Sequence, residues 1–327
     1  MRVGDPELHH ASRAMSHQTE KYGPEQGQIF INSLGAKDDS FREIPPVAKC
    51  PRVALFGDSF AEGWGLPFAD TVAGQLRRLL APQGVDVLGF GISSHCPSLT
   101  ERWMKKLVRK GVRWDLVLLL IDPGDSYDEK EARPFLNGET TPQRKDKPRF
   151  FRLRWYEYRL SYQLSRNIWE RLHPCGPPGL DLQQAVRGND WKVAWLDESA
   201  ASPWFRAGLE QSAQAVQKIQ KTASQQGFGV MIVVYPYPKM MAENKLQNGY
   251  VEFWSRFARE NNLPIVDLTP LFASDRQTVE QTYRENFIPG DFHWNAHASA
   301  RIANTLLPFI MKNLSARKPV PDTIQNP

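Results

Sequence analysis

RVALFGDSF, residues Arg52–Phe60, joins a short apolar run to a turn of small and polar residues. The run Val53–Phe56 is typical of a strand that is buried on both faces of a sheet. Gly57 ends this strand, and Ser59 follows at its carboxyl end, ahead of a helix that we predict over Asp70–Leu80. Because α/β sheets bind ligands outside the carboxyl ends of their strands, the Ser59 hydroxyl is predicted to lie where a ligand would bind.

Strands and helices are predicted to alternate along most of the remaining chain. Apolar runs predict four further strands, at 85–90, 115–122, 229–235 and 264–268. Amphipathic or glycine-terminated segments predict helices at 100–110, 204–226, 249–261 and 296–313. Strands separated by helices form parallel sheets with right-handed crossovers, so the pattern predicts an α/β fold with the continuously apolar strand 115–122 near its centre.

A serine hydroxyl is a weak nucleophile at neutral pH unless a base removes its proton. One candidate base lies far downstream, in the sequence GDFHWN at Gly290–Asn295. There His293 would take the Ser59 proton, and Asp291 would hold the imidazole tautomer and stabilise the imidazolium. The alternatives are that Ser59 only caps a turn and that His293 is an ordinary surface histidine. Asp267, after the fifth predicted strand, is an alternative to Asp291.

Three motifs resemble the GDSL/SGNH hydrolase superfamily. They are GDSF at Gly57–Phe60, D-x-H-W-N at Asp291–Asn295 and the upstream phrase INSLGAKD at Ile31–Asp38. The resemblance covers roughly residues 30–130 and 205–312. It implies a three-layer α/β/α sandwich with a five-stranded parallel sheet of flavodoxin-like strand order, and the middle of the chain then forms an inserted cap.

The same resemblance implies a Ser-His-Asp triad made of Ser59, His293 and Asp291. The hypothesis is therefore a serine esterase that acts on a small-molecule or carbohydrate ester, with O-acetylated carbohydrates among the candidate substrates. The alternatives are an O-acyltransferase that uses the same acyl-enzyme and a catalytically degenerate carbohydrate-binding relative. The two-residue step from Asp291 to His293 is also similar to the D-x-H-W of alginate-type O-acetyltransferases.

Acyl transfer also needs hydrogen-bond donors for the oxyanion, each of which contributes roughly 3 kcal/mol. The expected donors are the backbone N–H groups of Ser59 and Ser94, although Ser94 stands where the superfamily usually has glycine. Asp125, in Gly124-Asp125-Ser126, stands where the superfamily has an asparagine. An ionised carboxylate cannot donate, so Asp125 would need a pKa raised by burial or by a nearby carboxylate. Otherwise Ser126 or a water would have to donate.

Composition is ordinary for a globular protein, with 327 residues, 41% hydrophobic and 24% charged. No apolar run approaches the ~18 residues that span a bilayer, and Met1–Glu25 has no signal-peptide core. This indicates a cytoplasmic chain, but the INSLGAKD phrase often follows a signal or anchor in the superfamily, so an extracytoplasmic location stays open. Three cysteines at these spacings match no metal motif, and we expect neither a metal nor a cofactor.

Three parts are predicted: an N-terminal arm and lead-in at 1–48, a hydrolase-like domain at 49–313 with an insertion at about 134–203, and a tail at 314–327. The insertion is rich in aromatic residues, and ten Lys/Arg stand against four acids over Arg133–His173. This segment could be a solvated face, a cap that binds an acidic or sugar-containing substrate, or a membrane-surface contact. Nucleic acid is not expected as a partner, because no nucleic-acid-binding module is recognisable.

Overall fold

The computed structural model describes residues 2–22, 25–140, 180–188, 190–196, 202–273 and 277–316. Its main sheet has the strand order β10-β9-β8-β6-β7-β5-β4-β3. The first five of these strands are parallel to one another, and taken in chain order they give the flavodoxin-like order 2-1-3-4-5. The predicted fold class, a three-layer α/β/α sandwich around five parallel strands, is therefore confirmed. The parallel strands are β6 (Arg52–Gly57), β7 (Asp86–Gly91), β8 (Leu116–Ile121), β9 (Gly229–Val234) and β10 (Ile265–Asp267).

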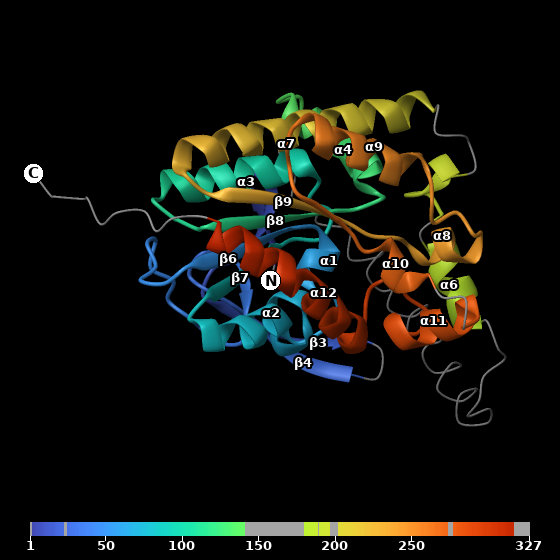
Figure 1. Ribbon diagram of the computed structural model, residues 1–327, viewed down its shortest axis with the longest axis horizontal. Helices are drawn as coiled ribbons and strands as arrows, with labels where there is room; N and C mark the ends of the chain where they lie inside the picture. The colour runs from blue at the N-terminus through green and yellow to red at the C-terminus, as the bar shows by residue number, and fades with distance from the viewer. Residues whose placement is uncertain are drawn as a thin grey trace, which may run out of the picture.

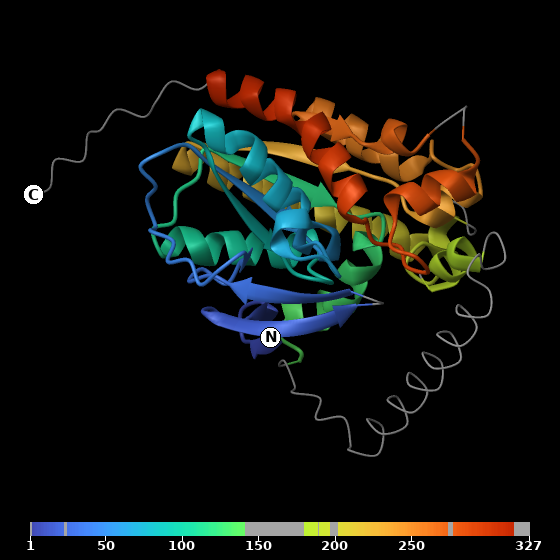
Figure 2. The same ribbon diagram turned by 90° about the horizontal axis from the view of Figure 1, so that it is seen from below.

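The sheet is larger than predicted, because the N-terminal segment extends it. Three antiparallel strands continue the sheet beyond β7: β5 (Lys37–Asp38), β4 (Glu25–Ile31) and β3 (Ser16–Tyr22). A separate hairpin precedes them, made of β1 (Arg2–Asp5) and β2 (His9–Ser12). The segment predicted as an N-terminal arm thus forms strands, which lie along one side of the molecule near the N-terminus (Figure 2).

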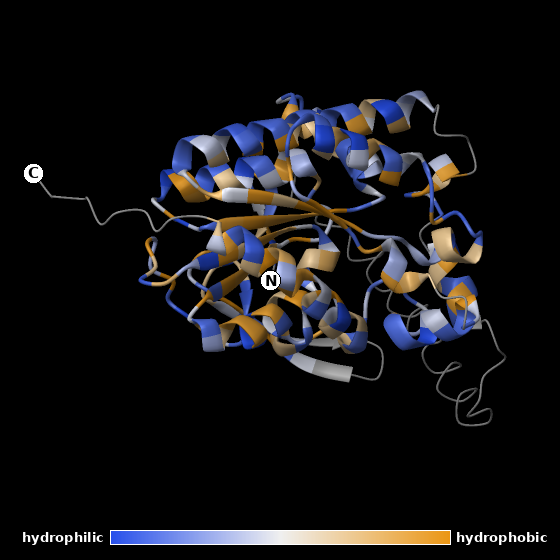
Figure 3. Cartoon of the chain, viewed as in Figure 1, coloured by the Kyte–Doolittle hydropathy of each residue, from blue (hydrophilic) through white to orange (hydrophobic). Residues whose placement is uncertain are grey.

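Helices cover both faces of the sheet (Figure 1). One face carries α2 (Val72–Leu80) and α12 (Ala296–Ser315), which contact each other. The other face carries α3 (Pro97–Arg109), α4 (Asp125–Leu136), α7 (Pro203–Gln226) and α9 (Gly249–Glu260). The central strands β6, β8 and β9 are buried along their whole length, which explains their continuously apolar sequences (Figure 3).

Short helices gather where the parallel strands end (Figure 1). The sequence did not lead us to expect α1 (Ser59–Glu62), α6 (Leu180–Gly188), α8 (Pro238–Ala242), α10 (Thr269–Phe272) or α11 (Val279–Asn286). Helix α6 belongs to the predicted insertion and contacts α8 and α11. Residues 141–179 and 197–201 of that insertion, with most of its basic residues, lie outside the described residues. Within the described part, no helix is both long and apolar enough to cross a membrane.

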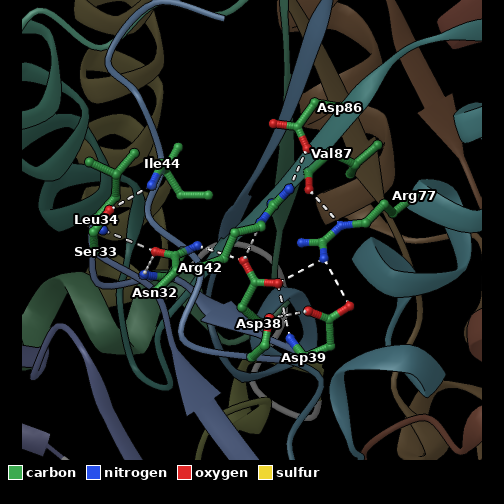
Figure 4. Close-up of polar contacts among 12 residues, drawn as sticks. Asn32, Ser33, Leu34, Asp38, Asp39, Arg42, Ile44, Arg77, Asp86 and Val87 are labelled. Atoms are coloured by element: carbon green, nitrogen blue, oxygen red, sulfur yellow. Dashed lines mark hydrogen bonds and ion pairs between the residues drawn. The ribbon is translucent and has the colours of Figure 1, made fainter.

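The lead-in Ile31–Asp38 is fixed by a polar network (Figure 4). Asn32 Oδ1 accepts hydrogen bonds from the N–H groups of Leu34 and Ala36, and Asn32 Nδ2 donates to Asp38. The fully buried carboxylate of Asp38 also pairs with Arg77 at 2.7 Å and with Arg42 at 3.1 Å. These cations, with Asn32, hold the pKa of Asp38 below its usual value although burial raises it. The network therefore joins the lead-in to helix α2, which carries Arg77.

Candidate active site

Ser59 is the first residue of helix α1, directly after strand β6. The Asp58 side chain caps this helix by accepting a hydrogen bond from the Phe60 N–H at 2.9 Å. A residue at the first helical position has no intrahelical acceptor for its own N–H, so the Ser59 N–H is left for a ligand. Helix α1 passes so close to strand β7 that a Cβ on Gly91 would lie 1.9 Å from the Glu62 nitrogen. Gly91 therefore fixes the approach of the helix that carries Ser59.

His293 and Asp291 lie beside Ser59. His293 Nε2 is 2.8 Å from Ser59 Oγ, and His293 Nδ1 is 2.6 Å from Asp291 Oδ1. A carboxylate accepts hydrogen bonds, so Nδ1 carries the proton and the Nε2 lone pair faces the serine hydroxyl. Ser59 and His293 are 4% and 6% exposed, which shields this hydrogen-bonded chain from bulk water. The predicted alternative, Asp267, instead accepts the Thr269 N–H at the end of β10.

A tight loop allows the Asp291 carboxylate to reach the His293 ring although only one residue separates them. The Ile288 N–H donates to His293 O, and the Asp291 N–H donates to Ile288 O, both at 2.9 Å. The Tyr283 hydroxyl donates to the Asp291 carbonyl at 2.8 Å from helix α11. Because of this bend, Asp291 Oδ1 accepts from both the N–H and the ring of His293.

Beneath Ser59 lies a cluster of buried carboxyl groups that sequence reasoning missed. Burial and the neighbouring Asp122 raise the pKa of Asp58 well above its usual value, which favours its neutral form. Asp58 Oδ2 lies 3.3 Å from Ser59 Oγ, farther than His293 Nε2, and a neutral carboxyl competes weakly for the serine proton. The Tyr237 hydroxyl donates to Asp122 at 2.7 Å. Asp122 and Tyr237 each follow a buried strand by one to three residues, and that position is the signal that could have revealed them.

Lys192 places a buried cation against this carboxyl cluster. Its Nζ lies 2.6 Å from Asp128 Oδ2, and both side chains are nearly inaccessible. Burial lowers the pKa of Lys192, but the acidic groups of Asp128, Asp122 and Asp58 outweigh burial and raise it. Lys192 therefore stays charged and offsets part of the negative charge beneath Ser59.

Ser94 takes a backbone conformation that favours glycine. Its φ is +63°, in the left-handed region, and its side chain is exposed. In the described part of the chain, the Ser94 N–H donates to no other group, so it is available to a ligand. Together with Ser59 N–H, this gives two candidate oxyanion donors.

Asp125 meets one condition for a donor but is not hydrogen-bonded to either candidate oxyanion donor in the described residues. Burial, with Asp122 and Asp58, raises its pKa well above the usual value, which favours the neutral carboxyl. Asp125 Oδ2 accepts the Asp122 N–H at 2.8 Å, and Oδ1 has no hydrogen-bond partner within the described structure. No hydrogen bond joins Asp125 to Ser59 or Ser94 in the residues that the structure covers. Ser126, the alternative donor, packs against Gly208 of α7.

Comparisons with known proteins place few constraints on this chain. No family model matches it, and no curated protein matches it. Several solved structures have a similar course of the chain. One is a putative lipolytic protein of the G-D-S-L family from Desulfitobacterium hafniense DCB-2. It has 11% identity and a TM-score of 0.43, and the match covers 79% of this chain and 98% of that chain. An acetylxylan esterase from Geobacillus stearothermophilus has 12% identity and a TM-score of 0.39 over 83% of this chain and 96% of that one. The psychrotrophic esterase EstA from Pseudoalteromonas sp. has 9% identity and a TM-score of 0.42 over 81% and 98%.

At these identities and TM-scores, the likenesses carry no argument about what this chain does. The chemistry of the site has to be argued from its own residues. Among the described residues, no group of three or more His, Cys, Asp or Glu side chains could hold a metal ion.

Proposed function

We propose that this protein is a serine esterase of the GDSL/SGNH type. The observation that carries the proposal is the continuous hydrogen-bonded chain from Ser59 Oγ through the His293 imidazole to the Asp291 carboxylate, with distances of 2.8 and 2.6 Å. A nucleophile, a base within hydrogen-bond reach and a group that orients the base are the arrangement that nucleophilic catalysis requires.

In the proposed reaction, Ser59 Oγ attacks the ester carbonyl carbon while His293 Nε2 takes the serine proton. The oxyanion that forms is bound by the N–H groups of Ser59 and Ser94, each of which contributes roughly 3 kcal/mol when well placed. Collapse of the tetrahedral intermediate breaks the ester bond, and His293 returns its proton to the leaving alcohol. Water then enters, gives a proton to His293 and attacks the acyl-serine, which releases the acid and restores Ser59.

The proposed substrate is an ester of a small molecule or a carbohydrate, with O-acetylated sugars as the first candidates to examine. These candidates come from the sequence resemblance. The first assay therefore needs an ester that makes few demands on a pocket, such as 4-nitrophenyl acetate.

Labelling with a fluorophosphonate tests the proposal directly. The reagent should phosphonylate Ser59, which peptide mass spectrometry would locate, and Ser59→Ala should remove both the adduct and hydrolysis of 4-nitrophenyl acetate. We expect His293→Ala to reduce kcat by about 10³-fold or more, because residues of such a unit depend on one another.

Ser224→Ala is the matched control, since Ser224 is exposed on helix α7 and makes only a local hydrogen bond to the Gln220 carbonyl. This variant should label and turn over like the wild type. An unlabelled Ser59 in correctly folded protein, or full hydrolysis by Ser59→Ala, would contradict the proposed function.

A further inference from the structure

The peptide unit between Ser93 and Ser94 is held from outside the catalytic domain by the N-terminal hairpin. His10 Nε2, on strand β2, lies 2.9 Å from the Ser93 carbonyl oxygen. A carbonyl oxygen can only accept, so His10 Nε2 carries the proton and donates it. The backbone of His10 is also held in place, because His95 Nε2 donates to the His10 carbonyl oxygen at 2.9 Å.

The Ser93 carbonyl and the Ser94 N–H belong to one planar peptide group. In a trans peptide they point in opposite directions, so a donor fixed on the carbonyl also fixes the direction of the N–H. A hydrogen bond to the carbonyl further polarises the group and makes its N–H a stronger donor. The Ser94 N–H is the second oxyanion donor of the proposed function, and this inference rests on that function.

The His10 ring is itself held in one tautomer. Burial, with smaller effects of Arg2 and His9, lowers the pKa of His10 to about 4, although the Ser93 carbonyl and Glu62 raise it. The ring is therefore neutral near pH 7, with its proton on Nε2. His10 Nδ1 must then accept, and His9 Nδ1, at 2.9 Å, is the donor.

A second contact joins this loop to the helix of the nucleophile. Glu62, the last residue of α1, accepts the Ser93 N–H at 2.8 Å. Arg2, from strand β1, pairs with the same Glu62 oxygen at 2.7 Å. His10 thus fixes the Ser93 carbonyl, and Glu62 fixes the Ser93 N–H. These two contacts keep the candidate oxyanion donors, the N–H groups of Ser59 and Ser94, in their relative positions.

We propose that His10 is a positioning residue of the esterase, which orients and polarises the Ser93–Ser94 peptide group through its Nε2–H. The N-terminal hairpin is then part of the catalytic apparatus although none of its residues touches the reacting atoms.

The test compares His10→Gln with His10→Leu, two side chains of similar size that differ in the donor. The Gln amide can place an N–H near the position of His10 Nε2, and Leu cannot. With 4-nitrophenyl acetate, we expect His10→Leu to lower kcat at least tenfold with KM changed less than threefold. His10→Gln should stay within about threefold of the wild-type kcat. His17→Ala, an exposed histidine of strand β3, is the control and should leave both parameters unchanged.

Three outcomes would overturn the proposal. In the first, folded His10→Leu keeps the wild-type kcat. In the second, His10→Gln loses as much kcat as His10→Leu, which shows that the ring acts by packing. In the third, KM changes while kcat does not. In each case, wild-type activity that depends on Ser59 would still support the proposed esterase function. A wild type that neither labels at Ser59 nor hydrolyses the ester would contradict both the esterase function and the role of His10. The melting temperature of each variant shows that it is folded.

Discussion

Ser94 holds a left-handed backbone conformation that an L side chain adopts only at a cost in free energy. Its φ of +63° places its Cβ near the following carbonyl, which costs roughly 1–2 kcal/mol. The proposed oxyanion hole needs only the N–H of this residue, so the exposed Ser94 side chain gives nothing that would offset the strain. Hydrogen bonds to both sides of residue 93 hold the loop in place against it.

We predict that Ser94→Gly stabilises the protein by about 0.5 kcal/mol and keeps its activity. The strain of roughly 1–2 kcal/mol is relieved, but the greater freedom of glycine in the unfolded chain returns about 0.5–1 kcal/mol. Urea denaturation at neutral pH measures the difference. Ser93→Gly is the control, because Ser93 has no positive φ and should only lose stability. A destabilised Ser94→Gly would show that the serine side chain has a role of its own.

Burial of the Asp125 carboxyl makes the stability of the fold depend on pH. Its folded-state pKa is raised above the unfolded value, so the folded protein binds the proton more tightly. The resulting stability is complete below about pH 4 and is lost as the pH rises from there through the folded-state pKa. At neutral pH the carboxyl therefore destabilises the fold relative to a neutral side chain of the same shape.

We predict that Asp125→Asn stabilises the protein, and that the gain grows as the pH rises above about 4. The Asn carbonyl can still accept the Asp122 N–H, so the hydrogen bond at 2.8 Å survives. Unfolding free energies of variant and wild type at pH 4, 6 and 8 measure this slope. A gain that is the same at all three values would show that Asp125 does not change its protonation on unfolding. Activity with 4-nitrophenyl acetate, measured alongside, tells whether the amide also improves turnover.

At the scale of elements, the short helix α1 depends on a buried lysine from the lead-in. Lys37, on strand β5 and 5% exposed, donates to the carbonyl oxygens of Gly63 at 2.9 Å and of Leu66 at 2.6 Å. These carbonyls lie at the end of α1 and in the loop beyond it, where the Gly63 carbonyl also accepts the Leu66 N–H at 3.1 Å. A strand of only two residues, which lies between β7 and β4 in the sheet, thus anchors the segment that follows Ser59.

We predict that Lys37→Met lowers the free energy of unfolding by about 2 kcal/mol. Each charge-assisted hydrogen bond contributes roughly 1.5–3 kcal/mol, and the variant leaves two carbonyls without this donor, although the methionine no longer buries a charge. Thermal and urea denaturation measure the loss. Lys110→Met, at the exposed end of helix α3, is the matched control and should change stability by less than about 0.5 kcal/mol.

At the scale of the whole molecule, the sequence predicts the elements with strong local patterns. The five parallel strands are apolar runs bounded by turns, and all five were predicted within two residues of their observed ends. Strand β3 escaped prediction because its sequence, SHQTEKY, has no apolar face, and it forms only as the edge partner of β4. The structure of β3 depends on its pairing with β4, and the local sequence does not indicate this pairing.

The same distinction holds for the site. Two motifs were enough to name Ser59, Asp291 and His293 as candidates, because each motif is continuous in sequence. The contact of His10 with Ser93 spans 83 positions and the Tyr237–Asp122 hydrogen bond spans 115, so only the folded chain brings these groups together. Whether Asp125 faces the nucleophile was equally beyond the sequence, since the direction of a side chain depends on packing around it.

Strand β6 is the first of the parallel strands to be synthesised, whereas His293 follows Ser59 by 234 positions. A nascent chain still on the ribosome therefore displays the hydroxyl long before its base exists. If Ser59 and His293 act as we propose, such an unfinished polypeptide is chemically inert toward esters, and so is any product of premature termination.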